Sequence, residues 1–203
     1  MAGLLLAAGG GRRLGGRPKA LLDHRGRPLV EHAARALRAG GCDPVHIVLG
    51  AAADSVRARA DLSSYEVSEN PDWPQGMGTS LRVGLAALAG SGADAVVVSL
   101  VDQPGIGAAA VARLIAAYAT GADLAAASYG GRRGHPVLFG AARWPAIAAT
   151  AEGDRGARAY LQRHTDALTL VECSDIAEPY DIDTPEDLQR LEATEATQSG
   201  DGE

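Results

Sequence analysis

The sequence predicts an α/β protein with a doubly wound, mainly parallel sheet. Short apolar runs alternate with amphipathic segments along most of the 203 residues, which is the pattern of strands joined by crossover helices. The hydrophobic fraction is 46%, but it is rich in Ala, Leu and Val and contains one Phe, so it suits helices packed through small residues. Neither an internal repeat nor a linker divides the chain. We therefore expect one domain over 1–193 and a disordered polar tail over 194–203.

The predicted strands are short runs of apolar or β-branched residues. The run at 3–8 is apolar on both faces, which is typical of a strand buried in a parallel sheet. The run at 95–101 gives the strongest prediction because it is β-branched and stops abruptly at Asp102. Further strands are expected at 45–49, 65–67, 124–128, 135–139 and 167–171.

Helices are predicted where apolar residues recur every three or four positions. The first begins at Pro28 and ends at the glycine pair 40–41. Thr79 or Ser80 is expected to cap another, and Thr184 begins the last, with Asp187 completing its capping box. The remaining predicted helices cover 54–60, 108–118 and 155–164.

Composition excludes several classes of protein. The net charge is -6 and the cations are confined to loops, which argues against a nucleic-acid-binding face. Cys42 and Cys173 are far apart and form no C-x-x-C pair, so neither a disulfide framework nor a zinc site is indicated. The first apolar run is too short to span a membrane and lacks a signal peptide's basic start. We expect a cytoplasmic protein without nucleic-acid or membrane partners.

A glycine-rich basic loop at 9–19 follows the first strand. Gly9, Gly10 and Gly11 allow backbone N–H groups to approach phosphate oxygens. Positive charge for an anionic ligand comes from Arg12, Arg13, Arg17 and Lys19. The alternative is an ordinary turn with solvated cations.

Two familiar phosphate motifs do not fit this loop. The dinucleotide fingerprint G-x-G-x-x-G, started at Gly9, requires glycine at Leu14. The P-loop requires G-K-[ST], but Gly16 is followed by Arg17 and Pro18. The sequence therefore predicts a phosphate-binding loop of a third kind.

Two carboxylates are candidate metal ligands. Asp102 ends a buried strand, where it can hold Mg²⁺ against bound phosphates or bond to nearby backbone N–H groups as a turn residue. Asp183 precedes the cap that uses Asp187, so it is free for another role, whereas Asp181 is expected to point to the opposite side. Ligands bind beyond the carboxyl ends of the strands in such sheets, so the loops should gather there. These loops are 9–19, 69–80, 102–106 and 181–183.

The first loop resembles that of the MobA-like NTP transferases. It carries Leu6-Ala7-Ala8-Gly9, then Arg13, Gly15, Pro18 and Lys19. Further matches follow in order at 70–71, 76–85, 100–104, 134–139, 153–158 and 181–187. The set resembles the MocA-type branch, the molybdenum cofactor cytidylyltransferases, whereas the guanylyltransferase branch has L-A-G-G where this chain has Ala8. The resemblance implies a Rossmann-like fold of the nucleotide-diphospho-sugar transferase kind.

The resemblance also implies a reaction and a set of site residues. A terminal phosphate of molybdopterin cofactor attacks the α-phosphorus of a nucleoside triphosphate, CTP in this branch, and pyrophosphate leaves. Arg13, Lys19 and Asp102 are implied to be catalytic, and Asp102 and Asp183 to hold Mg²⁺. The residues implied to bind the nucleotide are Leu6, Ala7, Ala8, Gly9, Gly10, Gly11, Arg13, Lys19, Gly78, Thr79 and Ser80.

Several alternatives remain open from the sequence. His135 and Arg132 can bind the acceptor, or be a structural histidine and an exposed turn cation. The chain can instead be a guanylyl- or other nucleotidyltransferase with a different phosphorylated acceptor, or a non-catalytic carrier of nucleotide or cofactor. A molybdoenzyme that receives the product is a further expected partner.

Overall fold

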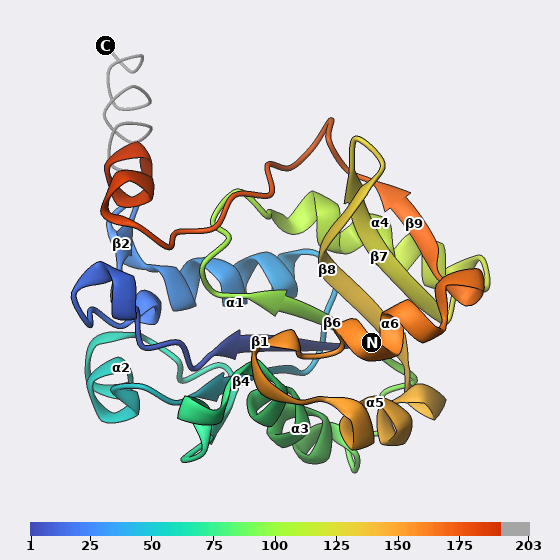
Figure 1. Ribbon diagram of the computed structural model, residues 1–203, viewed down its shortest axis with the longest axis horizontal. Helices are drawn as coiled ribbons and strands as arrows, with labels where there is room; N and C mark the ends of the chain where they lie inside the picture. Colours follow the sequence, from blue (N-terminus) through green and yellow to red (C-terminus); the bar gives the residue numbers. More distant parts are fainter. Residues whose placement is uncertain (192–203) are drawn as a thin grey trace.

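A seven-stranded sheet forms the centre of the computed structural model, which describes residues 1–191. The strand order is β5-β4-β1-β6-β8-β7-β9, and β8 runs antiparallel to both of its neighbours while the other adjacent pairs are parallel (Figure 1). The strands are β1 (Ala2–Ala7), β4 (Val45–Leu49), β5 (Glu66–Glu69), β6 (Ala95–Leu100), β7 (Leu124–Tyr129), β8 (Arg132–Gly140) and β9 (Thr169–Glu172).

Helices cover both faces of this sheet. One face is covered by α1 (Leu29–Ala39), α2 (Ala53–Arg59), α4 (Ala108–Ala119) and the helix that begins at 185. The other face is covered by α3 (Met77–Leu88), α5 (Trp144–Thr150) and α6 (Arg158–Arg163) (Figure 1). A two-stranded hairpin, β2 (Asp23–His24) with β3 (Arg27–Pro28), precedes α1.

The strand β1 is buried on both faces because its side chains alternate between two apolar clusters. Leu5 and Ala7 belong to the cluster that contains α1 and α4, whereas Leu4 and Leu6 belong to the cluster that contains α3. This arrangement explains the unbroken apolar run in the sequence, since a central parallel strand has no face toward water.

The side of the sheet on which successive strands are added changes next to β1. The β4 and β5 strands are added on one side of it and β6 on the other, so β1 and β6 flank the topological switch point. The loops after these two strands open into one crevice, which is where doubly wound sheets bind ligands. The predicted doubly wound, mainly parallel α/β fold is confirmed.

Two details of the fold differ from the predictions. Helix α3 begins at Met77 with Gly76 at its N-cap, so the prediction that Thr79 or Ser80 caps it is wrong. Gly76 has φ 108° and a Cβ there would lie 2.3 Å from the backbone of Gly153, so the turn before the helix requires glycine. Helix α5 was not predicted; it starts at Trp144 with a proline in its first turn.

The predicted domain boundary at 193 and the tail at 194–203 lie outside the described residues. Within residues 1–191, none of the helices has both the length and the apolar character needed to cross a membrane.

Candidate active site

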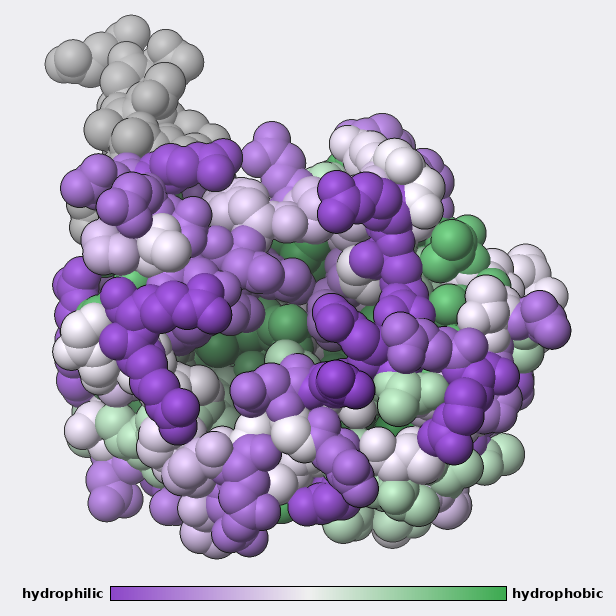
Figure 2. All heavy atoms as spheres, in the orientation of Figure 1, coloured by the Kyte–Doolittle hydropathy of each residue, from purple (hydrophilic) through white to green (hydrophobic). Residues whose placement is uncertain are grey.

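The loops at the carboxyl ends of β1 and β6 surround a cavity of about 500 Å³, here called the first cavity. Its walls come from the glycine loop after β1, the start of α3, the end of β6 and the segment before the last helix. Figure 2 shows a hollow on this face, with apolar residues at its floor and hydrophilic residues around its rim. The predicted gathering of these loops at one edge of the sheet is confirmed.

The glycine loop is folded so tightly that one position admits no side chain. Gly11 has φ 58°, and a Cβ there would lie 1.9 Å from the carbonyl oxygen of Arg17. The same glycine's carbonyl accepts hydrogen bonds from the N–H groups of Leu14 (2.8 Å) and Gly16 (3.0 Å). The loop therefore returns upon itself and presents its backbone to the cavity beside Arg12 and Arg13.

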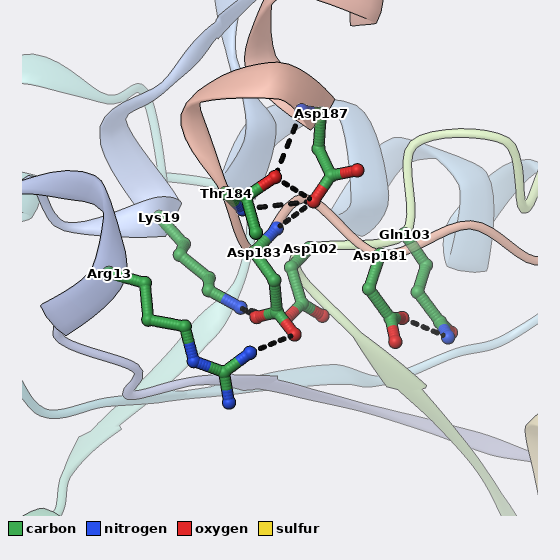
Figure 3. A network of polar contacts seen from close by, with 8 residues as sticks. All are labelled: Arg13, Lys19, Asp102, Gln103, Asp181, Asp183, Thr184 and Asp187. Carbon is green, nitrogen blue, oxygen red and sulfur yellow. Dashed lines mark hydrogen bonds and ion pairs between the residues drawn. The ribbon is translucent and has the colours of Figure 1, made fainter.

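Lys19 lies between two carboxylates in the lining of this cavity. Its Nζ donates to Asp102 Oδ2 at 2.6 Å and also to Asp183 Oδ1, while Arg13 reaches Asp183 Oδ2 at 3.4 Å (Figure 3). The chain has 18 arginines but this single lysine. The ammonium group of lysine is compact and has three donors, so it can donate to two separate carboxylates. The planar guanidinium group of arginine instead favours two parallel hydrogen bonds to one carboxylate.

The two carboxylates control the protonation of Lys19. Burial lowers its pKa, but Asp102 and Asp183 raise it through charge and hydrogen bonding, and the net shift is upward. Lys19 is therefore fully charged near neutral pH, as a group that neutralises phosphate charge must be.

Local structure fixes both acids. The N–H of Ile182 donates to the Asp102 carbonyl at 2.9 Å, which ties the segment before the last helix to the end of β6. Asp187 Oδ2 accepts from the N–H groups of Asp183 (3.1 Å) and Thr184 (2.9 Å), and its own N–H donates to the Thr184 hydroxyl at 3.2 Å. The predicted capping box is therefore confirmed, and it leaves the Asp183 carboxylate directed at Lys19 (Figure 3).

The donor set at this point fits a hard divalent cation. Two carboxylate oxygens from Asp102 and Asp183 converge on one positive group. Among residues 1–191 no group of three or more His, Cys, Asp or Glu side chains is arranged to hold a metal, so Asp102 and Asp183 are the candidate donors. Mg²⁺ takes one or two carboxylates together with phosphate and water oxygens, which suits this site.

A second cavity, of about 630 Å³, adjoins the first. Met77, Leu100, Asp154 and Asp181 line both cavities, so a ligand in one can reach a ligand in the other. The second cavity is also lined by four arginines, Arg132, Arg133, Arg155 and Arg158. Within the described part of the chain, none of these guanidinium groups has a carboxylate or hydrogen-bond partner, so their charge is available to an anion.

His135 lies in the wall of the second cavity at the middle of β8. Burial lowers its pKa to about 4; Asp102 opposes this shift and Arg133 adds to it. The imidazole is therefore neutral at physiological pH, and its own backbone carbonyl accepts a hydrogen bond from the Tyr129 hydroxyl at 2.7 Å.

The structure brings most of the predicted site residues together. Those that line the first cavity are Leu6, Ala8, Gly9, Gly10, Gly11, Arg13, Lys19, Ser80, Asp102 and Asp183. Arg132 and His135 line the second cavity. Their roles stay predictions.

Three predicted nucleotide-binding residues lie behind the cavity wall. Ala7 is buried in the core. Gly78 packs against the backbone of 151–152, where a Cβ would lie 2.6 Å from the Glu152 nitrogen. The Thr79 hydroxyl donates to the Gly76 carbonyl at 2.8 Å and accepts from Asn70 at 2.7 Å, so it fixes the turn before α3.

Other cavity residues were missed or misplaced by the sequence reasoning. Asp181 lines both cavities and Asp183 lines the first, so the expectation that Asp181 points to the side opposite Asp183 is wrong, because residues two apart in an extended segment share a face. Asp154 also lines both cavities. It lies in the segment 153–158, and the resemblance of that segment to the family was the sequence feature that could have identified it. Trp73 lies against the glycine loop, because a Cβ at Gly10 would be 3.0 Å from its ring, and it also lines the first cavity.

A doubly wound sheet with a glycine loop, a lysine and two aspartates at its switch point defines an enzyme that handles nucleoside phosphates. The sequence pattern of the MobA-like NTP transferase domain matches residues 3–168, and the chain belongs to this family. The predicted family and the predicted class, a nucleotidyltransferase, are confirmed at this level.

Two characterised relatives cover nearly the whole chain. A nicotine blue oxidoreductase from Paenarthrobacter nicotinovorans is 45% identical, over 93% of this chain and 95% of its own. A molybdenum cofactor guanylyltransferase from Cereibacter sphaeroides is 32% identical, over 94% of this chain and 95% of its own.

Solved structures share the fold of this chain. The crystal structure of a homologue of Mycobacterium tuberculosis Rv0371c, from Mycobacterium sp. strain JC1, superposes with a TM-score of 0.84 at 30% identity and covers 97% of both chains. Rv0371c itself, from Mycobacterium tuberculosis H37Rv in complex with manganese, gives 0.78 at 28% identity, over 94% of this chain and 96% of its own.

Proposed function

We propose that the protein transfers a nucleoside monophosphate, CMP from CTP, to the terminal phosphate of molybdopterin cofactor and releases pyrophosphate. The observation that carries this proposal is the pair of adjoining cavities. One has a glycine loop, Lys19 and two aspartates; the other has four arginines that pair with no carboxylate among residues 1–191. Two phosphorylated substrates in these cavities would meet at the shared wall that contains Asp181 and Met77.

The chain's own residues would act mainly by placing and neutralising phosphates. An oxygen of the acceptor phosphate forms a bond to the α-phosphorus of CTP, and the bond from that phosphorus to the β-phosphate oxygen breaks. Lys19 and Arg13 would contact the triphosphate and offset the charge that moves onto the departing pyrophosphate. The arginines of the second cavity would hold the acceptor in line.

We also propose that Asp102 and Asp183 hold Mg²⁺ in the working enzyme. When bound, the metal supplies charge neutralisation on the phosphate oxygens. The convergence of the two carboxylates supports this, and so does the manganese complex of the 28%-identical Rv0371c. Lys19 would then exchange a carboxylate oxygen for a phosphate oxygen as the nucleotide binds.

CTP is preferred in this proposal because of Ala8. Ala8 lines the first cavity, and its methyl group packs against Gly50, where a Cβ would lie 2.7 Å from it. A wall thickened by one methyl group suits a pyrimidine more than a purine. A guanylyltransferase is the alternative that the 32%-identical relative favours.

A second candidate function is an oxidoreductase activity, which the 45% identity to the nicotine blue oxidoreductase favours. Pyrophosphate release separates the candidates when purified protein is assayed with molybdopterin cofactor and each of CTP, GTP, ATP and UTP. Release with CTP supports the proposal, and release with GTP alone supports the guanylyl alternative. Nucleotide binding without release indicates a carrier. A redox change of nicotine blue, without pyrophosphate release, indicates the oxidoreductase.

A further inference from the structure

An exposed carboxylate at the end of β9 accepts hydrogen bonds from five donors. It belongs to Glu172, the last residue of β9, which pairs with β7 at the edge of the sheet (Figure 1). Its Oε2 accepts from the Ser128 hydroxyl at 2.8 Å and from the Gly131 N–H at 3.4 Å. Its Oε1 accepts from the N–H groups of Gly130 (3.3 Å) and Ser174 (3.0 Å), and the Ser174 hydroxyl also donates to it. Glu172 therefore ties β9 to the turn between β7 and β8.

This turn depends on Glu172 because the ladder beside it is irregular. The register of β7 on β8 shifts between Ala126 and Ser128, so regular pairing does not continue unbroken to the end of the hairpin. Hydrogen bonds from Ser174 and Ser128 lower the pKa of the Glu172 carboxyl to about 2. The carboxylate is thus ionised at any working pH and accepts from all of its donors.

The turn carries two arginines of the second cavity. Arg132 pairs with Tyr129 and Arg133 with Ser128 across the hairpin, and both arginines line that cavity. Glu172 itself lies outside the lining of both cavities. It can therefore affect a ligand there only through the residues that the turn presents.

One of these arginines is held close to another cation. Burial lowers the pKa of Arg133, and the charge of Arg158, the first residue of α6, lowers it further. Among residues 1–191 no carboxylate pairs with either guanidinium group, so their repulsion favours movement of the turn away from α6. The hydrogen bonds from the turn to Glu172 oppose this movement.

We propose that Glu172 is a positioning residue for the second cavity: it holds the turn at 130–131 so that Arg133 stays beside Arg158 and both contact the same anionic group. This inference rests on the proposed function, since it takes the second cavity as the acceptor site. Glu172 acts through Arg133 and does not touch the acceptor.

Calorimetric titration with inorganic phosphate tests this without turnover. The test variant is Glu172→Gln, which keeps the size of the side chain but replaces one accepting oxygen by a donor group. The matched control is Asp175→Asn, the same chemical change at an exposed carboxylate that pairs with Arg113 outside both cavities. Each substitution removes one negative charge, which by itself would tighten phosphate binding, whereas a loss of positioning weakens it. Phosphate in the first cavity contributes equally to every variant, because the substituted residues do not line it.

We expect Glu172→Gln to weaken phosphate binding about tenfold, as for the loss of one charge-assisted contact, and Asp175→Asn to leave it within about twofold. Arg133→Met should weaken binding at least as much as Glu172→Gln. Adding Glu172→Gln to Arg133→Met should then have little further effect, because the first residue acts through the second. Ser128→Ala removes one donor from the same carboxylate and should weaken binding in the same direction, so the inference does not depend on a single substitution.

In the pyrophosphate assay, Glu172→Gln should raise the KM for molybdopterin cofactor and leave the KM for CTP near wild type. A wild type that binds phosphate no more tightly than Glu172→Gln or Arg133→Met would overturn the inference, and so would additive losses in the double variant. Absence of pyrophosphate release from wild type would count against the proposed function alone, because the phosphate titration does not depend on turnover.

Discussion

Replacement of Lys19 by methionine tests the ion-paired group of Lys19, Asp102 and Asp183 in two separate ways. The substitution keeps most of the side-chain volume but removes the charge that two carboxylates share. Without it, Asp102 and Asp183 face each other across a partly buried site, and the triphosphate loses its nearest ammonium group. We therefore expect a loss of stability in the free protein and a loss of turnover.

The size of the stability effect follows from burial. The side chains of Lys19, Asp102 and Asp183 are 13%, 19% and 39% exposed, between a surface pair and a buried one. Surface pairs contribute up to about 1 kcal/mol, and breaking a buried pair costs about 3–5 kcal/mol, so we expect about 2 kcal/mol here. For a chain of this size, that corresponds to a fall in Tm of roughly 4–8 °C.

Mg²⁺ should reverse this loss selectively. The cation binds the folded state where the ammonium group stood, so it stabilises Lys19→Met more than wild type, in which Lys19 competes for the same carboxylates. Thermal unfolding in EDTA and in saturating Mg²⁺ measures both effects. In the pyrophosphate assay, kcat/KM for the nucleotide should fall roughly 10²–10³-fold, as for the loss of one transition-state contact.

The matched control is Arg17→Met, which removes a cation from the same loop outside both cavities. It should change Tm and kcat/KM little, as expected for a surface substitution. An unchanged Tm for Lys19→Met in EDTA would refute the ion-pair argument. An equal Mg²⁺ response in wild type and Lys19→Met would refute the metal assignment to Asp102 and Asp183.

Three further changes address individual residues. Asp102→Asn should reduce pyrophosphate release roughly 10³-fold or more while circular dichroism stays native, because the backbone bond to Ile182 is kept; a wild-type rate would exclude Asp102 as a metal ligand. Ala8→Gly should raise the ratio of GTP to CTP kcat/KM about tenfold by removing a methyl group from the cavity wall, and a constant ratio would show that Ala8 does not select the base. His135→Gln should reduce the loss of folding stability that accompanies a fall in pH from 7 to 5. The native pKa of His135 is about 4 and the unfolded value 6.5, so in wild type the unfolded chain binds more protons in this window and stability falls as pH drops through it. Between pH 7 and pH 5 that loss is up to about 2 kcal/mol, measured by urea unfolding, and equal losses in wild type and His135→Gln would contradict it.

The fold could be predicted to a large extent because its strands carry strong local patterns. An apolar run such as 3–8 is typical of a strand with both faces covered, and alternation with helices implies parallel crossovers. Helix α5 was missed because 144–150 is small, alanine-rich and only two turns long, so its periodicity is weak. The start of α3 was misassigned because Thr79 and Ser80 are favourable capping residues in isolation, whereas the structure uses their hydroxyls to hold Asn70.

The sequence by itself determined the residues that lie at the carboxyl ends of β1 and β6, since a strand's end and the charge after it are local features. It thereby identified the glycine loop, Lys19 and the two aspartates as one candidate site. Only the tertiary structure decided how they meet: Lys19 lies between Asp102 and Asp183, which are 83 and 164 residues away in the chain. It also decided that Asp181 turns toward Gln103 and into both cavities. Asp181 and Asp183 lie two residues apart, so alternation in an extended segment places them on one face, but the surface that this face meets depends on how distant strands pack.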